Sequence, residues 1–99
     1  MVALLSPADL ANRISALDGW EGDTGGIRRA YKAPDFRTGI ALVSAVAEVA
    51  EEMNHHPDID IRWRTVHFAV VTHSAGGVTD LDVELAGRID GLAAEHKAV

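Results

Sequence analysis

The sequence predicts an α+β domain in which three helices cover one face of a four-stranded antiparallel sheet. Three segments repeat apolar residues at helical spacing, and extended segments between them alternate apolar and polar residues. Their order along the chain is helix, two strands, helix, two strands, helix. With 99 residues, the chain is long enough to bury one core, so we expect residues 1–99 to form a single domain.

Composition excludes several classes of protein. The chain is 47% hydrophobic and 24% charged, and no apolar run approaches the ~20 residues of a membrane span. There is no cysteine, which excludes disulfides, thiolate nucleophiles and cysteine-based metal sites. A formal charge of −6 and no basic block longer than Arg28-Arg29 oppose nucleic-acid binding. Met1–Leu5 lacks the features of a signal sequence, so we expect a cytoplasmic protein.

The first helix is predicted to begin at Ser6, the N-cap, with Pro7 at the first helical position. Its apolar stripe is Leu10, Ile14 and Leu17. Gly19 is expected to end it. A glycine-rich stretch after Trp20 then predicts a short strand and a turn, and residues 27–33 alternate in the manner of a second strand.

The longest helix is predicted over residues 36–53, after Pro34-Asp35. One apolar stripe comprises Phe36, Ile40, Val43, Ala47 and Ala50, and it is widened by Leu42, Val46, Val49 and Met53. Because the polar side is narrow, this helix must be covered by the sheet, another helix or another subunit. Asn54 can stop the helix and Pro57 forbids its continuation.

Residues 59–73 are extended, and the apolar phase of their alternation changes near Arg64. This change predicts either a tight hairpin or a bulge between two shorter strands. Residues 74–77 predict a turn, and Thr79 with Asp82 resembles a capping box that opens a third helix. The buried stripe of that helix is expected to be Leu81, Leu85, Ile89 and Leu92.

Histidines gather where a helix and a strand end. Residues 51–57 read Glu-Glu-Met-Asn-His-His-Pro, and Thr72-His73 follows the last predicted strand. Imidazoles titrate near neutral pH, so such a cluster can donate and accept protons, which indicates acid/base chemistry on a small molecule. We expect His67 on an exposed strand face and His96 on the surface of a polar tail.

Other interpretations of the histidines stay open at this stage. His55 and His56 could simply hydrogen-bond a helix terminus. Three histidines and an acid could also hold zinc or iron, although no His-x-His or His-x-x-x-His pair is present. Ser74 lies beside His73 but lacks the glycine-framed elbow of a serine nucleophile.

The chain resembles the pterin-4a-carbinolamine dehydratase family over about residues 5–95. The shared features, in order, are Trp20, the extended Arg28–Lys32, Phe36, the Glu-x-x-x-His-His-Pro run of residues 51–57, Thr72-His73, and Gly76-Gly77-Val78-Thr79 with Asp82. Members dehydrate 4a-hydroxytetrahydrobiopterin to quinonoid dihydropterin in tetrahydrobiopterin recycling, without metal or another cofactor. The resemblance therefore implies a hydro-lyase that binds a pterin and forms a homodimer or homotetramer.

The resemblance also implies roles for individual residues. His55 and His73 match the acid/base histidines, and His56 matches one that orients the pterin. The wider set expected to bind substrate is Glu51, Asn54, Pro57, Thr72, Ser74, Ala75 and Asp82. Glu51 could fix the tautomer of an imidazole, whereas Asp82 could equally be the carboxylate of a capping box.

Two departures bear on the substrate rather than on the histidines. Ile59 and Leu81 replace an aromatic and an arginine that some members have. Members of the family also act as coactivators or assembly factors, so a non-catalytic partner-binding module is the alternative function.

Overall fold

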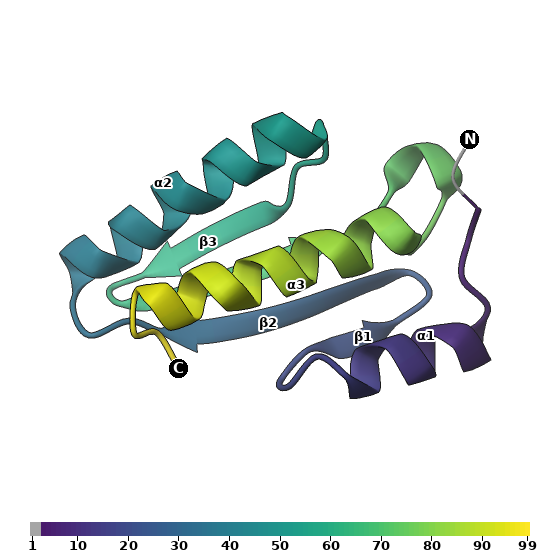
Figure 1. Cartoon of the computed structure of the whole chain (residues 1–99), viewed down its shortest axis with the longest axis horizontal. Coiled ribbons are helices and arrows are strands. Elements are labelled where there is room, and N and C mark those ends of the chain that lie inside the picture. Colours follow the sequence, from purple (N-terminus) through teal and green to yellow (C-terminus); the bar gives the residue numbers. More distant parts are fainter. Residues whose placement is uncertain (1–2) are drawn as a thin grey trace.

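The computed structural model describes residues 3–99 as helices packed on one face of a four-stranded sheet (Figure 1). The elements in chain order are α1 (Pro7–Ser15), β1 (Glu21–Asp23), β2 (Gly26–Lys32), α2 (Phe36–Met53), β3 (Asp58–Arg62), β4 (Thr65–Val70), the short 3-10 helix η1 (His73–Ala75) and α3 (Asp80–Glu95). The predicted fold class and order of elements are confirmed.

The sheet has the strand order β1-β2-β4-β3, and every neighbouring pair is antiparallel. Of the two alternatives predicted for this region, a hairpin or a bulge, strands β3 and β4 form the hairpin. It turns at Trp63 and Arg64, and Trp63 has a left-handed φ of 55°. The two-residue turn explains the change in apolar phase, because the alternation restarts on the returning strand. Asp58 pairs with Ala69, so the start of β3 lies beside the end of β4.

Side-chain caps fix where the helices begin. Ser6 accepts a hydrogen bond from the N–H of Asp9 at 3.1 Å, and Asp35 accepts one from the N–H of Thr38 at 2.7 Å. The prediction that the first helix extends to Gly19 is wrong. It ends at Ser15, with Ala16 as C-cap, and a turn follows before Gly19, whose φ is +85°.

The core lies between the sheet and the helices. The ring of Tyr31 meets the ring of Phe68 edge-on, with centroids 5.9 Å apart. Helix α2 buries Leu42, Val46, Val49 and Ala50 in this core. Two members of the apolar stripe predicted for this helix do not enter the core. Phe36 and Ile40 are turned outward and are 51% and 40% exposed.

A cluster of polar side chains links β2, and Trp20 before β1, to Asp90 of α3. The indole N–H of Trp20 donates to Tyr31 and to Asp90, and the Tyr31 hydroxyl donates to Asp90. The Arg29 guanidinium lies 4.1 Å from the Tyr31 ring centroid and donates to Asp90 at 3.0 Å. Burial raises the pKa of the Tyr31 hydroxyl well above its usual range, and the hydrogen bond to the Asp90 carboxylate is the next largest cause.

The end of the chain is tied to the sheet. Lys32 and Val99 exchange two backbone hydrogen bonds, at 2.7 and 2.9 Å. The expectation that His96 is a solvated tail residue is wrong. It is the half-buried C-cap residue of α3, and its Nδ1 lies 2.8 Å from the carbonyl oxygen of Leu92.

Candidate functional site

The left-handed end of α2 separates the paired histidines. Asn54 has φ 50° and ψ 43°, and the N–H of His55 donates to the carbonyl of Ala50 at 3.0 Å. Asparagine tolerates this conformation, and Pro57 prevents another helical turn. As a result His55 is buried while His56 is exposed. Figure 1 shows this end of α2 at the same end of the sheet as η1 and the start of α3.

His55 is held by a buried carboxylate. Its Nε2 lies 2.6 Å from Oδ1 of Asp82, although the two residues are 27 positions apart in sequence. The side chain of His55 is 10% exposed and that of Asp82 is not exposed at all. A buried carboxylate is stable only where hydrogen bonds satisfy it, so the surroundings of Asp82 are decisive.

The other carboxylate oxygen of Asp82 is bound by two threonines. Its Oδ2 accepts hydrogen bonds from the hydroxyl of Thr72 and from the backbone N–H of Thr79, both at 2.8 Å. The hydroxyls of Thr72 and Thr79 are also 2.8 Å apart. Thr79 and Asp82 form the predicted capping box of α3, so helix capping and the orientation of His55 use the same carboxylate.

His56 has an acidic partner of its own, but on the surface. Its Nε2 lies 2.5 Å from Oε2 of Glu51, one turn back along α2. The side chains are 56% and 75% exposed, so the pair contributes little to stability. It can nevertheless fix the orientation of the His56 imidazole.

His73 begins η1 and is exposed. Its neighbour Thr72 contacts Asp82, which contacts His55, so the two histidine segments meet through one carboxylate. Gly76, with φ +80°, lets the chain turn back so that Thr72 and Gly77 form an isolated bridge. The structure thus combines a buried, oriented imidazole with two exposed ones, a set that can both donate and accept protons.

The residues predicted to bind substrate divide into two groups. Thr72 and Asp82 are buried behind His55. The remainder are exposed or half-buried at the end of α2 and in η1, and they are Glu51, Asn54, Pro57, Ser74 and Ala75. The sequence did not single out Thr79 for the site, because a threonine before a helix already has a role as N-cap.

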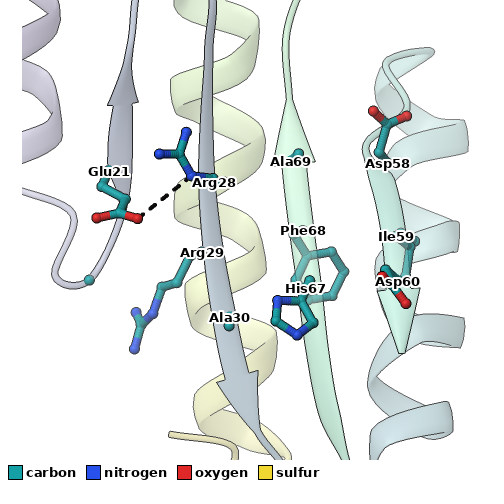
Figure 2. Close-up of a pocket in the computed structure, with 11 residues that line it drawn as sticks. Glu21, Arg28, Arg29, Ala30, Asp58, Ile59, Asp60, His67, Phe68 and Ala69 are labelled. Atoms are coloured by element: carbon teal, nitrogen blue, oxygen red, sulfur yellow. Dashed lines mark ion pairs between the residues drawn. The ribbon is translucent and has the colours of Figure 1, made fainter. Parts of the chain in front are cut away.

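Two hollows in the described part of the chain lie away from these histidines. One of about 460 Å³ lies over the helix-free face of the sheet (Figure 2). Arg28 and Glu21 form an ion pair at its β1 side with 3.6 Å between charged atoms, and Asp58 and Asp60 lie on β3. A second, of about 550 Å³, lies between α1 and β1. His67 lines the first, and it is exposed as predicted.

Two general features of residues 3–99 bear on the class of site. None of the helices formed by these residues has the length and apolar character required to cross a membrane. Over the same residues, no three His, Asp or Glu side chains are grouped so as to hold a metal ion.

The chain is similar to proteins of one family over nearly its full length. The family model described as pterin 4 alpha carbinolamine dehydratase matches residues 3–92. A relative from Mycobacterium avium named "Putative pterin-4-alpha-carbinolamine dehydratase" is 52% identical over 91 residues, 92% of this chain and 97% of the relative. One of the same name from Mycolicibacterium smegmatis is 50% identical over 94 residues, 95% of this chain and 100% of the relative.

Solved structures resemble this one as well. A transcriptional coactivator/pterin dehydratase from Brucella melitensis is 32% identical, with a TM-score of 0.86 over 90% of this chain and 97% of that chain. A pterin dehydratase-like protein described as a RuBisCO assembly factor in the alpha-carboxysome is 21% identical, with a TM-score of 0.62 over 75% of this chain and 86% of that chain. The latter shares the fold alone.

Proposed function

Because the chain belongs to the pterin-4a-carbinolamine dehydratase family, we propose that it removes water from a 4a-hydroxytetrahydropterin to give the quinonoid dihydropterin. The observation that carries this proposal is the buried pair of His55 and Asp82 beside the exposed His56 and His73. Imidazoles in different environments can serve one as the acid and the other as the base, which supports the proposal.

The reaction requires one proton to be given and one to be taken. The bond between C4a and its hydroxyl oxygen breaks, and the oxygen leaves as water after it receives a proton. A ring nitrogen loses a proton as the C=N bond forms, so no oxidant or reductant is consumed. His55 and His73 carry these two transfers in our proposal, and each is worth roughly 10²- to 10⁴-fold in rate.

The exposed residues of the site would position the pterin. His56, held by Glu51 at 2.5 Å, would contact the heterocycle beside His55. Asn54, Pro57, Ser74 and Ala75 would line the rim at the end of α2 and along η1. Thr72 and Asp82, which are buried, would act from behind His55 rather than by touching the substrate.

The activity belongs, in this proposal, to tetrahydrobiopterin recycling in the cytoplasm and needs no cofactor. Self-association as a homodimer or homotetramer is part of the same proposal. Strand β3 pairs only with β4 in the described part of the chain, which leaves its other edge free for a second copy. The outward side of α2, with Phe36 and Ile40 exposed, offers an apolar contact as well.

Stopped-flow absorbance of a freshly generated 4a-hydroxytetrahydropterin tests the proposal. We expect wild-type protein to accelerate the loss of substrate, and His55→Ala and His73→Ala each to lower kcat by roughly 10²- to 10⁴-fold. His67→Ala is the matched control, because it removes an exposed imidazole on the helix-free face of the sheet, away from the candidate site. It should retain the wild-type rate.

The alternative is a partner-binding or assembly module on the same fold. The names of two structural neighbours, a coactivator/pterin dehydratase and an assembly factor, favour testing it. A folded wild-type protein that leaves the spontaneous dehydration rate unchanged would support this alternative and reject the dehydratase.

A further inference from the structure

We propose that Thr72 is a positioning residue that, through Asp82, keeps the proton of neutral His55 on Nε2 and leaves Nδ1 to exchange a proton with the substrate. The location of the proton follows from hydrogen bonding alone. The role given to Nδ1 depends on the proposed function.

Two hydrogen-bond donors surround Oδ2 of Asp82. The backbone N–H of Thr79 can only donate, and it lies 2.8 Å from Oδ2. The hydroxyl of Thr72 donates to the same oxygen at 2.8 Å. Asp82 is also in the first turn of α3, where the helix dipole favours a negative charge. A carboxylate can only accept hydrogen bonds, so Asp82 is the acceptor in each of these contacts.

The hydroxyl hydrogens then have one consistent arrangement. The single hydrogen of Thr72 is used on Asp82, so Thr72 must accept in its contact with Thr79 at 2.8 Å. Thr79 therefore donates its hydroxyl hydrogen to Thr72, while its oxygen accepts from the N–H of Leu81 at 3.2 Å. The resulting series of hydrogen bonds runs from the Thr79 hydroxyl to the Thr72 hydroxyl to the Asp82 carboxylate, and each of these three buried side chains has a partner.

The tautomer of His55 follows from this series of hydrogen bonds. Oδ1 of Asp82 lies 2.6 Å from Nε2 of His55, and a carboxylate oxygen can only accept there. The proton of a neutral His55 is therefore on Nε2, and Nδ1 has the free lone pair. When Nδ1 takes a proton, the adjacent carboxylate stabilises the imidazolium that forms.

Asp82→Asn is predicted to reverse the tautomer. Since the N–H of Thr79 needs an acceptor, the amide oxygen of Asn must take the place of Oδ2. The amide NH₂ then faces His55, whose Nε2 can only accept, so the ring proton moves to Nδ1. Long-range ¹H–¹⁵N NMR correlations, recorded at a pH where the ring is neutral, distinguish the two tautomers.

The spectroscopic test uses no substrate, so it stands even if the protein is not a dehydratase. We expect the Nε2–H form in wild type and the Nδ1–H form in Asp82→Asn. A wild-type ring with its proton on Nδ1, or an Asp82→Asn ring that keeps it on Nε2, would overturn the inference.

Thr72 is tested with Thr72→Val and Thr72→Ser. Valine keeps the shape but removes the donor to Oδ2, so the Nε2–H resonance of His55 should move upfield and exchange faster with water. Serine restores the hydroxyl and should return both properties to wild-type values. Identical His55 resonances in wild type and Thr72→Val would reject a positioning role for Thr72. The unfolding midpoint of each variant establishes that it is folded.

Kinetics provide a separate readout if wild type is active. Thr72→Val should lower kcat by about 10- to 100-fold, if the loss is similar to that for groups that hydrogen-bond the ligands of metal sites. KM should be unchanged, and Thr72→Ser should recover most of kcat. A raised KM at constant kcat would instead make Thr72 a substrate-binding residue and contradict the inference.

Discussion

Removal of the Asp82 carboxylate is expected to destabilise the protein strongly. The side chain is fully buried and binds His55, Thr72 and Thr79 at 2.6 to 2.8 Å. Asp82→Ala leaves the donor groups of all three without their acceptor. Loss of one partner of a buried, hydrogen-bonded charge costs about 3–5 kcal/mol, a large part of the about 5–15 kcal/mol that stabilises a typical domain.

Urea unfolding followed by tryptophan fluorescence measures this cost. Trp20 is 4% exposed and Trp63 is 73% exposed, so Trp20 should supply most of the change in emission on unfolding. A loss of about 3–5 kcal/mol in the free energy of unfolding should appear as a lower urea concentration at the unfolding midpoint. The slope of this free energy against urea concentration should be unchanged.

Asp80→Ala is the matched control. Asp80 is in the same first turn of α3 but lies at the surface, where it pairs with Arg13 at 2.5 Å and is 67% exposed. Exposed pairs of this kind contribute about 0–1 kcal/mol. Equal losses in the two variants, or a loss below about 1 kcal/mol for Asp82→Ala, would refute the role assigned to the buried carboxylate.

Three further predictions concern the fold and the assembly. Because burial and Asp90 raise the pKa of Tyr31, the folded protein keeps its phenolic proton at pH values where the unfolded chain loses it. The stability supplied by this group should be complete below about pH 10 and should fall as the pH rises further. Tyr31→Phe should flatten this fall in unfolding curves recorded at alkaline pH. An unchanged fall in the variant would show that Tyr31 is not its cause. Gly22→Ala should destabilise, because φ is +142° and the new Cβ would lie 2.2 Å from the carbonyl oxygen of Gly26. A Cβ added at Gly91, in α3, would meet nothing within 4 Å, so Gly91→Ala should stabilise the protein by about 0.5–1 kcal/mol. Thermal melts in which Gly22→Ala is the more stable of the two variants would contradict this reasoning from the backbone. Ile40→Glu should reduce the mass measured by light scattering if α2 joins subunits, while the same mass in both proteins would exclude that contact.

Local signals in the sequence predicted most of the fold. Ser6, Asp35 and Thr79 marked the starts of the three helices, and the structure confirms each as an N-cap. The predicted range of residues 36–53 for the longest helix coincides with α2. These features depend on neighbours within a few residues, which is why a sequence is sufficient to predict them.

The side of α2 that enters the core could not be predicted in the same way. Apolar residues occupy most of its circumference, so its helical period fits burial of either Ile40 or Leu42. The choice depends on where the sheet lies, which is a long-range property. Leu42 is fully buried and Ile40 is 40% exposed.

The sequence could single out candidate residues but not the hydrogen bonds that join them. Residues 51–57 and His73 were singled out by an uncommon local pattern, and their role in a site stays a prediction. Asp82 contacts His55 across 27 positions and Thr72 across 10, and neither separation leaves a periodic signal. Trp20 and Asp90 meet across 70 positions for the same reason.

The central claim is that imidazoles from two separate segments dehydrate a 4a-hydroxypterin. The most direct measurement follows many turnovers of this substrate with a small amount of protein by stopped-flow absorbance. We predict a rate that rises in proportion to protein concentration and returns to the spontaneous rate in the double variant His55→Ala, His73→Ala. A spontaneous rate with folded wild-type protein, or full activity in the double variant, would contradict the account.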